Sequence, residues 1–160
     1  MNILSDKYDH IYQYGMDGIM IKILEDTPCE GVDTYASVGQ FSKTKNKEML
    51  MLFYPNVDKK LYGAIVSSII DYFKEHLELN YYGGHTPPLG PIVNGSNITA
   101  FYLRPAYAFE DEHIWEHYFW IVPITNKELE FLHREGPNAL EDHLEENEVD
   151  ILDLLRKDSF

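Results

Sequence analysis

The alternation of apolar and polar residues predicts three strands in the first third of the chain. After the turn signal Asp17–Gly18, residues 19–24 alternate with the period of two that is typical of strands. A second strand is expected over residues 34–38 and a third over residues 49–54, whose sequence MLMLFY has no polar position. Such a continuous apolar run indicates a strand that is covered on both faces. Residues 3–15 alternate only weakly, and we expect a short helix there.

The longest helix is predicted over residues 59–79, because apolar residues recur there at helical spacing. Asp58 stands at the position of its N-cap. Seven side chains form the expected core-facing stripe: Leu61, Ile65, Val66, Ile69, Ile70, Phe73 and Leu77. The loop at 81–91, YYGGHTPPLGP, is rich in glycine and proline and is not suited to regular structure. A further strand is expected over residues 98–107, with a break at Pro105.

The second half is organised around residues 117–136, which lead from an aromatic strand into a helix. The strand is predicted to end at Pro123, because proline has no amide hydrogen to give to a sheet. Residues 109–112 before it are expected to be an acidic loop. Thr125 and Glu128 have the spacing of a capping box, in which each side chain bonds to the amide of the other residue.

Gly136 is predicted to end that helix and Pro137 to open a short one that reaches residue 146. The order is therefore strands, a long helix, strands and then short helices. This order predicts an α+β fold over residues 1–160 as a single domain. In it, a mixed, mainly antiparallel sheet packs against one long helix and short C-terminal helices.

Charge is the most informative part of the composition. The formal net charge is −14, and residues 110–160 account for −11 of it, with 15 Asp or Glu against 4 Lys or Arg. Such a field repels nucleic acid and anionic membranes and attracts a basic partner, although simple solubility is an alternative explanation. The first residues lack the pattern of a secretory signal, and the single Cys29 suits a reducing compartment. We therefore expect a cytoplasmic protein.

One string, HIWEH from His113 to His117, matches the H-x-x-E-H motif of zinc peptidases. That motif works only on a helix, where residues four apart share a face. Because the string leads into an aromatic strand, we expect it to be extended, with the two histidines about 13 Å apart and unable to share an ion. We predict no metal, no cofactor and no catalytic residue.

Two segments offer candidates for protein binding. The loop at 81–91 carries amphipathic side chains that suit a contact surface but also suit packing on the sheet. The acidic segment before residue 117 suits either solvent or a basic partner. The candidate residues are Tyr81, Tyr82, His85, Glu110, Asp111, Glu112 and Glu116.

An ordered series of short segments carries a resemblance over roughly residues 30–157. The segments are DTYASVG at 33–39, EMLML at 48–52, YGGH at 82–85, IVPIT at 121–125 with Glu128, Glu135–Gly136 with Leu140, and DLLR at 153–156. In this series the chain resembles the suppressor-of-fused (SUFU) domain family in its small bacterial form.

The resemblance implies a mixed α/β fold without catalytic residues that acts by binding another protein. Single-domain bacterial members resemble immunity proteins, or antitoxins, which neutralise a cognate polymorphic toxin. A basic nuclease is the kind of toxin that fits the acidic charge. The alternative is an acidic adaptor or regulator that binds an intracellular protein other than a toxin. Nucleic acid and membranes are not expected as partners, and the oligomeric state is left open.

Overall fold

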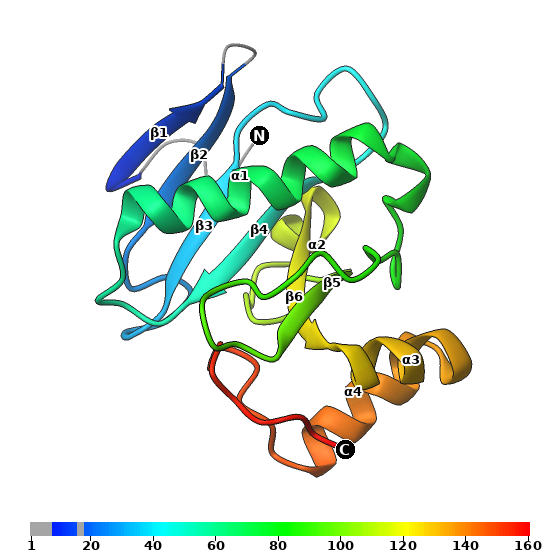
Figure 1. Cartoon of the computed structure of the whole chain (residues 1–160). Helices are drawn as coiled ribbons and strands as arrows, with labels where there is room; N and C mark the ends of the chain where they lie inside the picture. Colours follow the sequence, from blue (N-terminus) through cyan, green and yellow to red (C-terminus); the bar gives the residue numbers. More distant parts are fainter. Residues whose placement is uncertain (1–7, 16–17) are drawn as a thin grey trace. The chain divides into compact units, whose positions relative to one another are not determined.

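The structure is a computed structural model that describes residues 8–15 and 18–160 (Figure 1). Its strands are β1 (His10–Tyr14), β2 (Ile19–Leu24), β3 (Asp33–Ser37), β4 (Glu48–Phe53), β5 (Ile98–Pro105) and β6 (Tyr118–Thr125). Its helices are α1 (Lys59–Glu75), a 3-10 turn (Leu77–Leu79), α2 (Glu112–His117), α3 (Asn126–Glu135) and α4 (Pro137–Glu146). The strands hydrogen-bond in the order β1-β2-β3-β4-β6-β5. Strands β1 to β4 pair antiparallel and β4 pairs parallel with β6, which confirms the predicted α+β class with a mixed, mainly antiparallel sheet.

The chain forms two compact units. The first consists of Met1–Asn80 and Pro105–Trp120 and holds β1 to β4, α1 and α2. The second consists of Tyr81–Arg104 and Ile121–Phe160 and holds nearly all of β5, together with α3 and α4. Strand β6 begins in the first unit and ends in the second. The extent of one domain over residues 1–160 stays a prediction.

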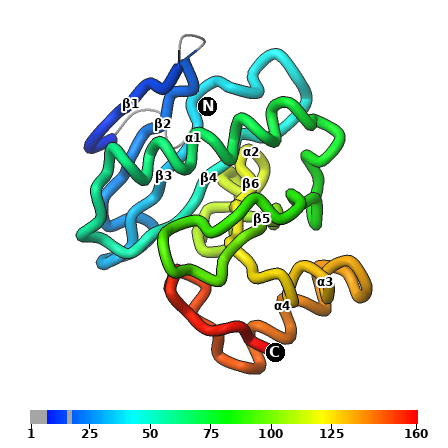
Figure 2. The backbone as a smooth tube through the Cα atoms, viewed as in Figure 1, coloured from blue at the N-terminus to red at the C-terminus, as the bar shows by residue number. Residues whose placement is uncertain are grey.

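In the first unit α1 lies across β1, β2 and β3, as both Figure 1 and Figure 2 show. The Asp58 carboxylate accepts a hydrogen bond from the Leu61 amide at 3.0 Å, which confirms the predicted N-cap. Val66, Ile70 and Phe73 are fully buried, but Leu61 is 55% exposed. A step of four residues turns a helix about 40° beyond one revolution, so Leu61 lies about 120° from Phe73 around the axis. The predicted stripe was wrong at Leu61 for this reason. It was also wrong at Leu77, which is 38% exposed and lies in the 3-10 turn, because α1 ends at Glu75 and not at residue 79.

Strand β4 is buried from Met49 to Phe53, where no side chain is more than 4% exposed. The prediction was wrong at its last residue, because Tyr54 lies beyond the strand and is 43% exposed. Successive side chains of a strand point to opposite faces of the sheet. Burial of all of them therefore confirms that this strand is covered on both faces.

The prediction of a helix over residues 3–15 is wrong for residues 10–14, which form β1, and its first residues lie outside the described part of the chain. His10, Tyr12 and Tyr14 occupy alternate positions, and their neighbouring ring centroids are 6.5 and 6.3 Å apart. The strand-like alternation with a period of two is therefore present, but it extends over only a few residues. Antiparallel pairing with β2 stabilises the extended form, so a contact distant in sequence decides the local structure.

The predicted end of the β6 strand at Pro123 is also wrong, because the strand continues to Thr125. The residues of β6 in register with β4 are Tyr118, Phe119 and Trp120. Pro123 lies beyond this pairing, so β4 requires no amide hydrogen from it. Helix α3 then begins at Asn126, and Gly136 ends it with a positive φ of 89°.

In the described part of the chain, every helix is too short or too polar to cross a membrane.

Candidate functional site

The acidic segment of the first unit builds the start of a helix. The predicted loop at 109–112 is wrong from Glu112 onward, where α2 begins. Asp111 is the N-cap, and its carboxylate accepts a hydrogen bond from the His113 amide at 2.9 Å. The Trp115 indole donates to the Phe109 carbonyl at 2.7 Å, which ties the short helix to the preceding turn. Asp111 therefore has a structural role as the N-cap of α2, which was not predicted from the sequence.

The HIWEH string lies in α2, so the expectation of an extended pair of histidines 13 Å apart is wrong. The cap at Asp111 is the signal that sequence reasoning missed, since aspartate followed by glutamate is typical of a helix start. His113 Nδ1 lies 3.8 Å from Glu116 Oε2, and both side chains are about two-thirds or more exposed, at 71% and 67%. No three His, Cys, Asp or Glu side chains come together to hold a metal ion among residues 8–15 and 18–160.

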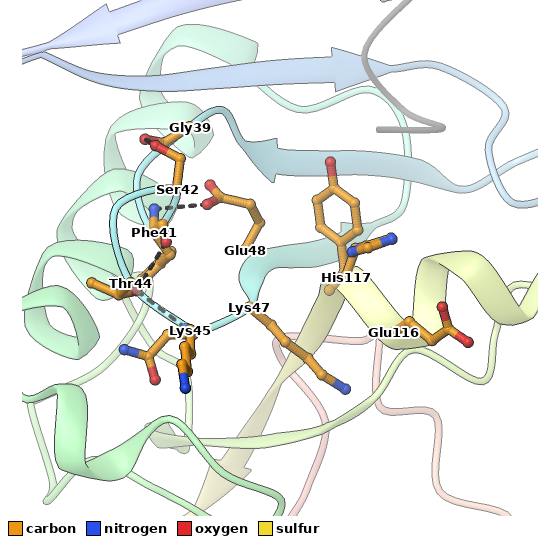
Figure 3. Close-up of a pocket in the computed structure, with 11 residues that line it drawn as sticks. Gly39, Phe41, Ser42, Thr44, Lys45, Lys47, Glu48, Glu116 and His117 are labelled. Carbon is orange, nitrogen blue, oxygen red and sulfur yellow. Dashed lines mark hydrogen bonds between the residues drawn. The ribbon is translucent and has the colours of Figure 1, made fainter. Parts of the chain in front are cut away.

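A pocket of about 420 Å³ lies beside the end of α2 (Figure 3). One side is formed by the basic loop between β3 and β4 together with the first residue of β4. These lining residues are Gly39, Phe41, Ser42, Thr44, Lys45, Asn46, Lys47 and Glu48. The other side is formed by Glu116, His117 and Tyr118. We call this site the Lys47 pocket. It lies entirely within the first unit, and Glu116 is the one predicted binding residue that lines it.

Hydrogen bonds from Glu48 hold the loop in shape. Its Oε1 accepts from the Ser37 hydroxyl and the Gln40 amide, both at 2.9 Å, and its Oε2 accepts from the Phe41 amide at 2.7 Å. The Thr44 hydroxyl donates to the Phe41 carbonyl at 2.8 Å. Three of the acceptor positions of this carboxylate are therefore used inside the protein, and the pocket wall is already formed without a partner.

Lys47 connects the basic loop to α2. Its ammonium donates to the Trp115 carbonyl at 2.8 Å and lies 4.8 Å from the centroid of the Phe119 ring. Burial lowers the pKa of Lys47, and the negative charge of Glu116 opposes that shift. The ammonium is thus held at the pocket by a helix carbonyl and an aromatic face, and the negative charge of Glu116 favours its protonated form.

The second unit holds the other predicted residues, Tyr81, Tyr82 and His85. The Tyr82 hydroxyl donates to a carboxylate oxygen of Glu141 at 2.6 Å, so this side chain fastens the loop to α4. The His85 ring lies 4.4 Å from the ring of His133, centroid to centroid. Tyr81 is 54% exposed. Only Tyr81 of these three is mostly open to solvent, and their role in binding stays a prediction.

The loop that carries them is less irregular than expected. The Gly83 and Thr86 amides donate to the Leu103 and Phe101 carbonyls at 2.8 and 2.9 Å, so the loop runs along β5. A single bridge joins His85 to Tyr102.

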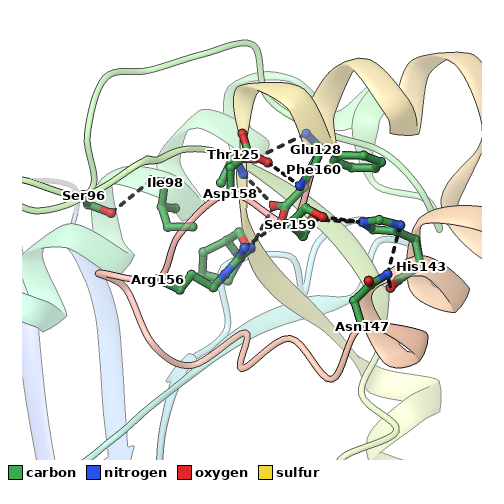
Figure 4. Close-up of polar contacts among 11 residues, drawn as sticks. Ser96, Ile98, Thr125, Glu128, His143, Asn147, Arg156, Asp158, Ser159 and Phe160 are labelled. Carbon is green, nitrogen blue, oxygen red and sulfur yellow. Dashed lines mark hydrogen bonds and ion pairs between the residues drawn. The ribbon is translucent and has the colours of Figure 1, made fainter.

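A buried network stabilises the start of α3 (Figure 4). The predicted capping box is confirmed, with 3.3 Å from the Glu128 amide to the Thr125 hydroxyl and 2.7 Å from the Thr125 amide to the Glu128 carboxylate. Sequence reasoning missed that Glu128 is completely buried and is paired with Arg156 by bonds of 2.6 and 2.8 Å. The Ser159 hydroxyl donates to the same carboxylate at 2.8 Å. We assign this network to stability.

Comparisons with known proteins agree with this fold. The family model described as Suppressor of fused protein (SUFU) matches residues 65–157. A crystal structure described as a SUFU homologue from Neisseria gonorrhoeae FA 1090 is similar with a TM-score of 0.77 and 17% identity, over 94% of this chain and 87% of that chain.

A chain of the Sufu–Fu complex is similar with a TM-score of 0.62 and 13% identity, over 88% of this chain and 77% of that chain. At these identities the two structures show a shared fold and no more. No curated protein matches the chain. The family model covers more than half of the sequence. The chain therefore belongs to the suppressor-of-fused (SUFU) protein family, and this membership indicates a protein-binding role.

Proposed function

We propose that this protein is a bacterial immunity protein that binds a cognate toxin in the cytoplasm of the producing cell and neutralises it. It acts by stoichiometric binding and not as an enzyme. The observation that carries the proposal is the negative charge of residues 110–160, carried mainly by exposed side chains in a family with a protein-binding role.

The exposure of the acidic residues supports a role in binding a partner rather than in stabilising the fold. Twelve of the 15 Asp and Glu side chains in residues 110–160 are exposed. The exceptions are Glu128, Glu141 and Asp158, of which the first two are ion-paired. Exposed like charges add little to folding stability, but they accelerate association with a partner of opposite sign. A basic toxin, such as a nuclease, is the partner that this surface suits.

On the first unit the best candidates for the contact are Glu110, Glu112 and Glu116. All three are exposed, and none has an ion pair with a lysine or arginine in the described residues. Asp111 is also exposed and stays a proposed contact, although its carboxylate caps α2 as well. Tyr81, Tyr82 and His85 remain proposed contacts on the second unit.

A second candidate is an acidic adaptor or regulator that binds a protein other than a toxin. The similar fold of a chain in the Sufu–Fu complex favours keeping this alternative, because that chain is found with a protein partner. Charge alone does not separate the two functions, since both partners can be basic.

A growth-rescue experiment distinguishes the immunity function from the adaptor function. The protein encoded beside this chain in the genome is expressed in a bacterial host, alone and together with this chain. We expect growth arrest with the neighbour alone, recovery with both, and a one-to-one complex on size exclusion. If the neighbour arrests growth and this chain neither restores it nor binds the neighbour, the immunity function is wrong. A neighbour that binds the chain but does not arrest growth favours the adaptor.

A further inference from the structure

We propose that the Lys47 pocket receives an aspartate or glutamate side chain of the protein partner. The inference rests on the proposed function in one respect, namely that the ligand belongs to a protein. It adds a feature that the acidic net charge alone would not lead one to expect, a pair of lysines lining one pocket of an anionic protein.

Clustered lysines provide the first reason. Three of the 13 Lys and Arg residues of the chain, Lys43, Lys45 and Lys47, lie within five residues of one loop. Lys45 and Lys47 line the pocket, whereas Lys43 does not. In a chain of net charge −14, two lysines at one concave site bring the local formal charge up to about neutral and place two cations within reach of one ligand.

The state of Lys47 provides the second reason. An ammonium group has three hydrogens to donate, and one of them is given to the Trp115 carbonyl. Partial burial lowers the pKa of Lys47, which means that its charge has lost some of its stabilisation by water. An anion in the pocket would restore this stabilisation, and a charge-assisted hydrogen bond of this type is stronger than a neutral one.

The preformed wall provides the third reason. Glu48 fixes the loop through three hydrogen bonds from within the protein, so binding does not have to order it. The Ser42 and Thr44 side chains and Asn46 add polar groups around the lysines.

A carboxylate suits this pocket better than a phosphate. The ionised groups that line it are Lys45, Lys47, Glu48 and Glu116, whose formal charges cancel. A phosphate monoester carries about −1.5 to −2 charges at pH 7 and needs more positive charge than that. A singly charged carboxylate can be held by direct hydrogen bonds from one or both lysines while it avoids Glu116.

The pocket places negatively and positively charged side chains side by side on the first unit. The exposed Glu116 of α2 lies on one side of the pocket, and Lys45 and Lys47 of the loop lie on the other. A basic partner that also places one carboxylate in the pocket is fixed in register. A basic partner without that carboxylate leaves the lysines unpaired, so the pocket selects among basic proteins.

A peptide titration tests the pocket without any toxin. The isotope-labelled protein is titrated at pH 7 with acetyl-Gly-Leu-Glu-Gly-amide, with the matching Gln peptide, and with inorganic phosphate, while the backbone amides of residues 39–48 are followed by NMR. We expect saturable shifts with the Glu peptide and about tenfold weaker binding of the Gln peptide, the loss that follows when a charged hydrogen-bond partner is removed. Equal binding of the two peptides, no binding of either, or tighter binding of phosphate would each overturn the assignment.

Three variants locate the effect. Lys47→Gln and Lys45→Gln each weaken the Glu peptide severalfold, whereas Lys43→Gln, from the same loop but outside the pocket, leaves it unchanged. If Lys47→Gln disturbs the loop, as the amide spectrum would reveal, Lys45→Gln decides the question. An equal effect of all three would indicate general attraction and would refute the pocket. Because growth rescue is measured separately, a failed immunity function and a failed pocket are told apart.

Discussion

The buried ion pair between Arg156 and Glu128 gives a quantitative test of the structure. The change is Arg156→Met, which keeps much of the side-chain volume and removes the charge. The side chains are 5% and 0% exposed, so the variant leaves a carboxylate that water cannot reach. Breaking a buried pair in this way costs about 3–5 kcal/mol of unfolding free energy.

The pH dependence of this loss follows from the pKa of Glu128. Burial by itself raises that pKa, but bonds and charge from Arg156, with the Thr125 amide and the Ser159 hydroxyl, outweigh it and lower the pKa. The native pair therefore adds stability above about pH 4.3, the pKa of an unfolded glutamate, and this stability is lost as the pH falls through the folded pKa. In Arg156→Met burial dominates, so the pKa rises and protonation relieves the buried charge.

Urea unfolding followed by circular dichroism measures both effects. We expect the free energy of unfolding of Arg156→Met to be about 3–5 kcal/mol lower than that of wild type at pH 7. This difference should shrink as the pH approaches 4. The exposed neighbour Lys157→Met is the matched control and should change stability by less than about 0.5 kcal/mol. The double variant Glu128→Gln/Arg156→Met should be more stable than Arg156→Met alone. A gap below about 1 kcal/mol that does not depend on pH would refute this reasoning.

Two further predictions concern α1 and α2 and use the same unfolding assay. Phe73→Ala should cost about 3–5 kcal/mol because the ring is fully buried, whereas Leu61→Ala should cost less than about 1 kcal/mol because Leu61 is exposed; similar costs would mean that α1 faces the sheet differently. Asp111→Ala should cost about 1 kcal/mol through the lost cap and should speed amide exchange in α2, whereas the exposed neighbour Glu110→Ala should do neither. Equal exchange in these two variants would contradict the cap.

Local sequence signals predicted much of this fold. The Asp58 cap, the Thr125 and Glu128 box and the Gly136 end depend on residues within one or two helical turns, and the structure has all three. The same is true of β4, whose continuous apolar run reports burial on both faces.

Errors arose where distant contacts or short elements decide the structure. β1 depends on pairing with β2, and the partner of Glu128 lies 28 residues further along the chain at Arg156. α2 has six residues, too few for a visible apolar period, and only the cap at Asp111 marked it. The Lys47 pocket could not be predicted, because the loop at 39–48 meets Glu116 and His117 only after β4 and β6 have paired.

The association rate with the toxin that growth rescue identifies tests the central claim most directly. Glu110, Glu112 and Glu116 are changed together to lysine, and Asp111 is kept so that α2 retains its cap. The control changes three exposed acids of the same unit, Glu30, Asp71 and Glu78, to lysine, which alters the net charge equally.

Stopped-flow measurements at several salt concentrations compare the three proteins. We predict that the α2 variant associates at least about tenfold more slowly than wild type at low salt, with a weaker dependence on salt, and that the control falls much less. An unchanged rate in the α2 variant, or an equal loss in the control, would contradict the claim that this acidic surface guides the partner.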